Sequence, residues 1–179
     1  GKQALESQIG GSANIAMGYL AGYSLVDGSF NVMIGQNAGD TITTGDRNVA
    51  IGINSLSTED TGSYNVAVGY FALNAQNADD TYNVAVGYEA GKSITTGPYN
   101  TIIGSKAGDA LTTGDSNTVL GYNALSTEDT GDKNVAIGYE ALTALNHDGS
   151  AYNVAIGYEA GHDVSSGIYN TLVGGLAGD

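Results

Sequence analysis

A pattern of asparagine, three residues and glycine recurs along the whole chain. Ten copies follow one another at a nearly constant interval of about 17 residues. Glycine stands four residues after the asparagine in every copy, and alanine stands seven residues after it in every copy except that of Ser55. A fixed period of this length is typical of an array of small units stacked in a line. The asparagines are Asn14, Asn31, Asn48, Asn65, Asn83, Asn100, Asn117, Asn134, Asn153 and Asn170.

Each repeat unit is too short for two helices with their turns, and its sequence favours β-structure. We count positions from the asparagine, so the glycine is at position 4. Positions 1 to 3 hold β-prone residues, as in Val66–Val68 and Thr101–Ile103. Glycine at position 4 allows a sharp corner at the strand end. We expect a second short strand or extended segment through position 7. Because both faces of the first strand are apolar, we also expect that strand to be covered on both sides.

These observations predict an all-β fold, a parallel β-solenoid of about ten coils. Residues 1–179 then form a single β-solenoid repeat array, in which a partial coil (1–13) precedes coils that start at residues 14, 31, 48, 65, 83, 100, 117, 134, 153 and 170. A coil spacing of about 4.8 Å gives roughly 50 Å for ten coils. Both ends of the sequence fall within a unit, so we expect a segment of a fibre or a unit that stacks end to end.

Position 8 alternates between two glycines and two leucines, which makes a longer period of four units. Where position 8 is glycine, position 11 is aliphatic, and where it is leucine, position 11 is polar; Leu145 is the exception. Because packed interiors resist both voids and excess volume, we expect one core volume to be filled from either position. The aliphatic residues are Leu25, Ile42, Ile94, Leu111 and Val164, and the polar ones are Gln8, Glu59, Gln76 and Glu128.

Stacked coils would place the ten asparagines in one column. We predict a structural ladder in which each side-chain amide bonds the next. The alternative is that asparagine is a turn residue that tolerates unusual φ angles. One thin coil buries few aliphatic side chains, and the free energy gained by burying them barely offsets the entropy lost when its backbone is ordered. We therefore also expect chains to pack side by side.

The repeated motif resembles a known family. Asn-Val-Ala-Ile-Gly (48–52, 134–138, 153–157) and Asn-Val-Ala-Val-Gly (65–69, 83–87) resemble the YadA-like head repeats of trimeric autotransporter adhesins. The longer units 134–142 and 153–161 resemble arrays in phage tail-fibre-like proteins. The resemblance implies a left-handed β-roll, a side-by-side homotrimer and a structural or adhesive role outside the cell. The repeat unit of this chain is longer than the usual adhesin head repeat.

Eleven of the twelve tyrosines occupy two positions of the repeat. The first group precedes the asparagine and forms a candidate contact stripe: Tyr64, Tyr82, Tyr99, Tyr152 and Tyr169. The second follows the glycine: Tyr19, Tyr70, Tyr88, Tyr122, Tyr139 and Tyr158. These stripes could stack on sugar rings of a receptor, or they could pack at the corners of the coil or between protomers.

Composition narrows the classes of function. The net charge of -14 opposes binding to nucleic acid or to anionic lipid, and no apolar run reaches the roughly 20 residues that span a bilayer. Without cysteine there is no thiol nucleophile and no thiolate metal site. His147 and His162 lie in variable segments, where we expect solvated side chains without metal-ligand partners. We predict no enzymatic activity, no cofactor and no metal.

Two further patterns have alternative interpretations. Acidic residues such as Asp46, Glu59 and Glu128 gather in the turns, where we expect a solvated edge that limits self-association rather than calcium ligands. Paired threonines (43–44, 95–96, 112–113) could suggest an ice-binding array, but other residues fill this position in most coils.

The sequence therefore predicts a structural or adhesive segment of an extracellular trimeric fibre, on a cell surface, on a virion or in a secreted filament. Its partner would be itself, and a surface glycan or protein receptor is a further candidate. The alternatives are a carbohydrate- or ice-binding module that uses one regular face, and the subunit of a head-to-tail filament.

Overall fold

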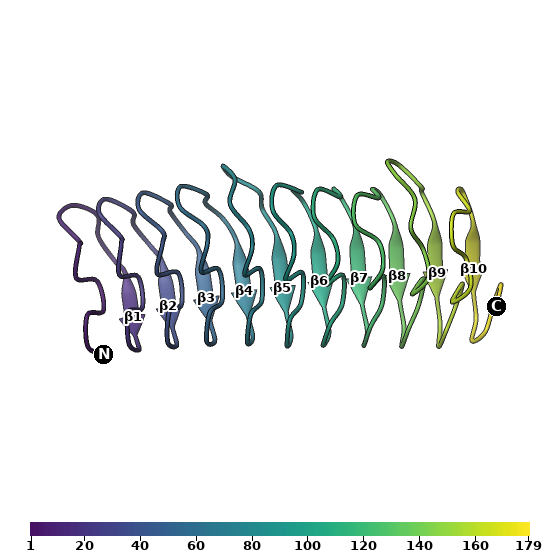
Figure 1. Cartoon of the computed structure of the whole chain (residues 1–179), viewed down its shortest axis with the longest axis horizontal. Coiled ribbons are helices and arrows are strands. Elements are labelled where there is room, and N and C mark those ends of the chain that lie inside the picture. Colours follow the sequence, from purple (N-terminus) through teal and green to yellow (C-terminus); the bar gives the residue numbers. More distant parts are fainter.

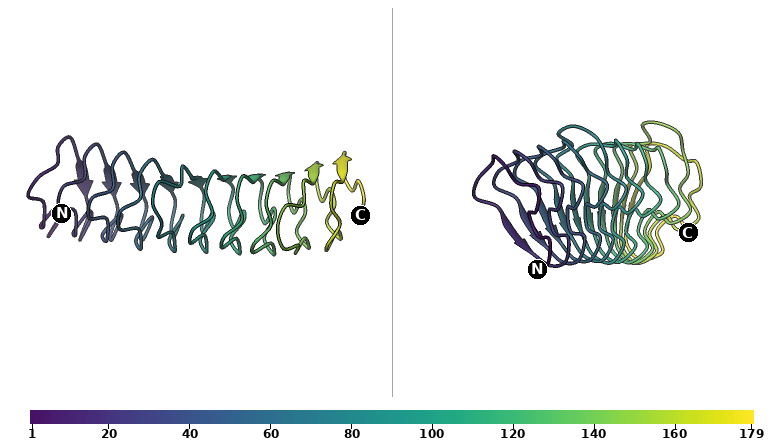
Figure 2. Two further views of the ribbon diagram at one scale, coloured as in Figure 1. Left: turned by 90° about the horizontal axis from the view of Figure 1, so that it is seen from above. Right: turned by 60° about the vertical axis from the view of Figure 1, so that its left-hand side comes forward.

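The computed structural model describes residues 1–179 as an elongated stack of coils, with one coil for each repeat (Figures 1 and 2). Each repeat contributes one strand of three residues directly after its asparagine, and all ten strands form one parallel sheet in chain order. The predicted all-β parallel solenoid is thus confirmed. No helical segment has the length and hydrophobicity needed to cross a bilayer. The strands are β1 (Ile15–Met17), β2 (Val32–Ile34), β3 (Val49–Ile51), β4 (Val66–Val68), β5 (Val84–Val86), β6 (Thr101–Ile103), β7 (Thr118–Leu120), β8 (Val135–Ile137), β9 (Val154–Ile156) and β10 (Thr171–Val173).

Equivalent residues of successive repeats lie next to each other in the sheet. Val49 pairs with Val66, and Val66 pairs with Val84 although this repeat is one residue longer. Val135 pairs with Val154 across the repeat that has two extra residues. The extra residues therefore lengthen the loops that rise after β4 and β8 (Figure 1) and leave the strand register unchanged.

The second strand predicted through position 7 is absent, so this expectation was wrong. Positions 6 and 8 have left-handed backbone conformations, as in Phe71 (φ 56°) and Leu73 (φ 46°), and an extended strand cannot contain them. The segment is a turn that keeps single hydrogen bonds to the next coil. The main-chain N–H of Leu73, for example, donates to the carbonyl oxygen of Ala90 at 3.1 Å.

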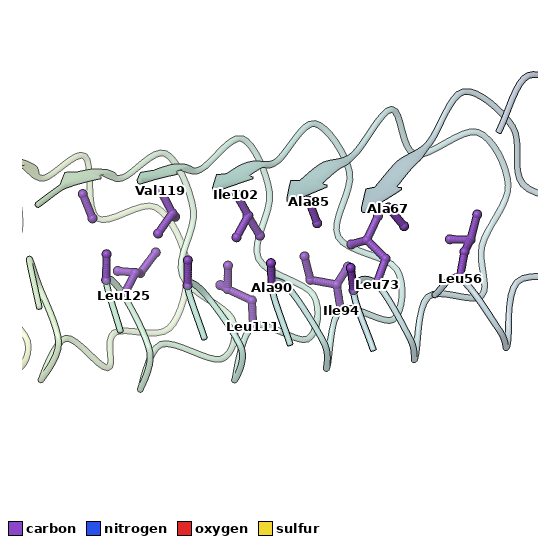
Figure 3. Close-up of a cluster of buried hydrophobic side chains, with 14 of the residues drawn as sticks. Leu56, Ala67, Leu73, Ala85, Ala90, Ile94, Ile102, Leu111, Val119 and Leu125 are labelled. Carbon is purple, nitrogen blue, oxygen red and sulfur yellow. The ribbon is translucent and has the colours of Figure 1, made fainter. Parts of the chain in front are cut away.

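The core is a narrow apolar column inside the coils. The middle residue of each strand from β2 to β9 is buried, and it faces the buried alanine of position 7 and the large residue of position 8 or 11 (Figure 3). The first and third strand residues lie on the outer face, where they are half-buried or exposed. The single chain therefore covers only one of the two apolar faces.

The alternation at positions 8 and 11 reflects a shared volume. A Cβ atom on Gly91 would lie 3.0 Å from Cδ1 of Ile94, which stands at position 11 of the same coil. In the preceding coil, Leu73 fills the volume from position 8 and is fully buried. Ile102 in β6 also borders this volume, because its Cδ1 would lie 3.1 Å from a Cβ atom on Gly91. The sequence did not identify this contribution, because the strand residue belongs to the next coil.

The glycine at position 4 is required for two reasons. Gly87 has a φ angle of 144°, which residues with a side chain rarely adopt. A Cβ atom there would also lie 2.4 Å from the carbonyl oxygen of Gly104 in the next coil. The corners of successive coils thus stack more closely than any side chain permits.

Candidate functional site

The ten asparagines lie in one column that joins and closes the coils. In the central coil, Oδ1 of Asn100 accepts a hydrogen bond from the main-chain N–H of Asn117 at 2.9 Å. Its Nδ2 donates to the carbonyl oxygen of Gly114 at 2.9 Å, which closes the coil. The first of these bonds recurs at 2.8–3.2 Å between every pair of neighbours in the column. The repeated partner is the next main-chain N–H, and direct amide-to-amide bonds occur only at Asn117, Asn134 and Asn170.

A second column of side-chain acceptors follows position 15, and we did not predict it from the sequence. The main-chain N–H of Ser29 donates to Oδ1 of Asp46 at 2.7 Å, and the N–H of Asp46 donates to Oγ of Ser63 at 3.0 Å. Oδ1 of Asp132 accepts from the N–H of Asp115 in the same way at 3.0 Å. The recurrence of serine or aspartate at this position was the signal, because both carry a side-chain oxygen close to the backbone.

Two glutamates of the turns, Glu59 and Glu128, are fully buried, so the expectation of a solvated acidic edge is wrong for them. Other acidic residues of the turns, such as Asp60, Asp79 and Asp80, are exposed as expected. Oε1 of Glu59 accepts from the main-chain N–H groups of Asp60 and Gly62 at 3.0 and 2.8 Å. Oε2 of Glu59 accepts from Nε2 of Gln76 at 3.0 Å, and Oε1 of Gln76 accepts from Asn83 of the ladder. The carboxylate is buried because it satisfies N–H groups that the turn directs inward.

Glu128 occupies the equivalent place four coils later. It accepts hydrogen bonds from the main-chain N–H groups of Asp129, Gly131 and His147 at 2.8–3.1 Å. Loss of hydration raises the pKa of both Glu59 and Glu128, and these hydrogen bonds offset only part of that effect. The two carboxyl groups therefore have a structural role.

The outer face of the sheet is an apolar stripe, formed by the first and third residues of every strand. Its side chains are aliphatic, methionine or threonine throughout. Ile103 and Leu120 are 39% and 46% exposed in the middle of the array, and nothing in the single chain covers them. Contiguous exposed apolar surface of this kind typically marks a contact surface.

The two tyrosine columns contain four short stacks, and Tyr19 belongs to none of them. Ring centroids of successive coils lie 5.0–5.7 Å apart with planes within 17° of parallel, so each ring face within a stack is covered by its neighbour. Tyr82 is nevertheless 44% exposed, which leaves its edge and hydroxyl to the solvent. A sugar ring cannot stack on Tyr82 or Tyr139, whose two faces are both covered, whereas the ring at each end of a stack has a tyrosine neighbour on one face only. The stacked pairs are Tyr64–Tyr82, Tyr82–Tyr99, Tyr70–Tyr88, Tyr122–Tyr139, Tyr139–Tyr158 and Tyr152–Tyr169.

Charged residues extend and flank these stacks. The Arg47 guanidinium lies 5.5 Å from the ring centroid of Tyr64, and Nζ of Lys133 lies 5.6 Å from that of Tyr152. In the other column, a hydrogen bond to the carboxylate of Glu159 raises the pKa of Tyr158 to about 12.

His162 interacts with its sequence neighbour Asp163, and the stacking of coils adds carboxylate partners from other coils. Its Nδ1 lies 2.8 Å from Asp163 and 3.9 Å from Asp179 of the next coil. These three residues bring potential ligand atoms within 4.8 Å of one another, so the expectation that His162 has no partner was wrong. The hydrogen bond to Asp163 raises the pKa of His162. All three side chains face solvent to a substantial extent, and they interact as an exposed charged group.

The two threonines of each pair have different environments. Oγ1 of Thr43, Thr95 and Thr112 donates to a carbonyl oxygen of the next coil at 2.9–3.1 Å. Only the second residue of each pair is exposed. The first threonine hydroxyls are therefore used within the solenoid.

Comparison with known proteins returned no match: no protein-family model, no curated protein and no solved structure is significantly similar to this chain.

Proposed function

We propose that this chain is a structural or adhesive segment of an extracellular trimeric fibre, in which chains pack side by side along the apolar stripe. The observation that supports this proposal is the stripe itself, which runs along ten coils without a covering layer. Burial of half-exposed aliphatic side chains contributes roughly 25 cal/mol per Å². A parallel sheet is normally covered on both faces, and a second copy of the chain would supply the missing layer.

The mechanism is mechanical. The asparagine column and the continuous sheet join every coil to its neighbours, so the array would resist bending and stretching as one rod. Turns of variable sequence would then display side chains to a receptor at regular intervals. Three chains, the left-handed winding and the extracellular location follow from the resemblance to adhesin and tail-fibre repeats, and they stay predictions.

The oligomeric mass in solution tests the side-by-side packing. We expect the wild-type chain to sediment as a trimer, and the double variant Val68→Lys/Val86→Lys to sediment as a monomer, because two lysines per chain would enter the apolar interface. Thr96→Lys adds a charge at an exposed turn and is the matched control, which should remain trimeric. A wild-type monomer at micromolar concentration would refute the proposal.

The same measurement separates the alternatives. A mass that grows continuously with concentration would favour a head-to-tail filament. A stable monomer that binds a glycan would favour a ligand-binding module, which would use tyrosine edges, hydroxyls or the outer ring faces at the ends of the stacks. For the adhesive role, we expect the trimer to bind receptor-bearing cells and loop substitutions at residues 77–80 or 146–149 to change that binding.

A further inference from the structure

Ten of the twelve tyrosines belong to the stacks described above, and the remaining two do not. Tyr19 and Tyr23 are 46% and 37% exposed, so they resemble the stacked tyrosines in accessibility but have no aromatic neighbour. Within a stack, each ring lies against the equivalent ring of the next coil, one repeat further along the chain. The solenoid thus holds several phenols in fixed pairs.

Tyrosine is also the side chain of this protein that is easiest to oxidise by one electron. The chain has no tryptophan and no cysteine, and of its two methionines Met33 is fully buried. A phenol that loses an electron and a proton becomes a phenoxyl radical, with unpaired spin on the carbons ortho to the oxygen. Two such radicals combine when those carbons meet.

We propose that the stacked pairs are sites of oxidative dityrosine coupling, which links successive coils of one chain covalently under the action of a haem peroxidase and hydrogen peroxide. Each of two tyrosines gives up one electron and one proton, and hydrogen peroxide accepts both pairs to form two water molecules. A carbon–carbon bond then forms between the two ortho carbons. The hydrogens on these carbons move to the oxygens as protons, which restores both aromatic rings and leaves the protein two hydrogens lighter.

The geometry favours this reaction over random coupling in three ways. The ring centroids are 5.0 to 5.7 Å apart, so a small rotation of two half-exposed side chains brings ortho carbons into contact. The exposed edges admit an oxidant at any ring, and the stack allows an electron to move from its neighbours. Carboxylates stand directly after several of these tyrosines and can accept the phenolic proton: Glu89 after Tyr88, Glu140 after Tyr139 and Glu159 after Tyr158.

Such links would fasten neighbouring coils against separation. They join residues of one chain, so the inference does not depend on the proposed trimer. A fibre that carries them would be hardened by an oxidising environment without any disulfide.

The test is to oxidise the dilute wild-type protein with a haem peroxidase and hydrogen peroxide, and to identify cross-linked peptides by mass spectrometry. We expect the characteristic dityrosine fluorescence and links confined to the six stacked pairs. Tyr139→Phe keeps the aromatic stack but should abolish the Tyr122–Tyr139 and Tyr139–Tyr158 links and leave the Tyr70–Tyr88 and Tyr64–Tyr82 links intact. Tyr19→Phe is the matched control and should change neither the yield nor the pattern.

Several results would overturn the inference. Links that involve Tyr19 or Tyr23 as often as stacked tyrosines would show that accessibility alone controls the reaction. Links between different columns, or between two copies of one residue, would show coupling between chains. The absence of dityrosine under conditions that couple free tyrosine would also refute it. Heating the oxidised and untreated proteins provides a second readout, and we expect a higher unfolding temperature only after oxidation.

Discussion

Replacing Asn100 by alanine tests whether the asparagine column holds the coils together. In the wild-type protein the side chain accepts from the buried main-chain N–H of Asn117 and donates to the carbonyl oxygen of Gly114. Alanine leaves both groups without a partner in a site that water does not reach, because Asn100 and Asn117 are 0% and 1% exposed.

Each buried polar group left unpaired costs about 1–3 kcal/mol. Two such groups predict a loss of about 2–6 kcal/mol, a large part of the roughly 5–15 kcal/mol that stabilises a typical domain. We expect urea unfolding to show this loss, and hydrogen exchange to accelerate first in the coils that contain β6 and β7. Thr113→Ala removes an exposed hydroxyl in the same coil and should change stability by less than about 0.5 kcal/mol.

A second substitution at the same site separates hydrogen bonding from packing. Asn100→Asp keeps the acceptor but directs a second oxygen at the carbonyl of Gly114, where only a protonated carboxyl group can donate. Folding therefore raises the pKa of the introduced carboxyl group, and stability should return as the pH falls through that raised value. If Asn100→Ala costs no more than the Thr113→Ala control, the asparagine is only a tolerant turn residue and the ladder does not stabilise the coils.

The remaining predictions address the corners, the core and the buried carboxyl groups. In thermal melts, Gly87→Ala should lower the free energy of unfolding by at least about 3 kcal/mol, because the added Cβ prevents the close stacking at that corner. Gly149→Ala is the control: an added Cβ would meet no atom within 4 Å there, and the loss should be about 1 kcal/mol. Gly91→Leu should lower the free energy of unfolding by about 1–3 kcal/mol, because the new side chain overpacks the core beside Ile94. Adding Ile94→Gln should recover part of this loss. If urea unfolding shows that the effects of the two substitutions simply add, the shared volume is refuted. Because burial raises the pKa of Glu59 and Glu128 above 4.5, the folded state retains protons to higher pH than the unfolded state. Their contribution to stability is therefore greatest below the ordinary glutamate pKa, and it is lost as the pH rises through the raised value. A double Glu59→Gln/Glu128→Gln variant lacks these groups, so its free energy of unfolding should depend less on pH.

Several features of the candidate site depend on residues brought together from different coils, and local patterns could not reveal them. Glu59 stands in a polar turn, and it is buried against the next coil, where Nε2 of Gln76 donates to its Oε2. His162 meets Asp179 only because one coil stacks on the next. The missing second strand has a different cause: left-handed residues such as Phe71 and Leu73 are not recognisable as such from their side chains.

The sequence by itself determined the period, the position of each strand and the need for glycine at each corner. A one-dimensional repeat of residue types requires that equivalent residues meet equivalent neighbours, and only one pairing register satisfies that condition in every coil. The tertiary structure decided which apolar face points inward. Both faces carry aliphatic side chains, so hydrophobicity cannot distinguish them. The closing turns place the middle strand residues, which are mostly alanines but include Met33, Ile102 and Val119, inside a narrow coil, and they leave the first and third strand residues outside.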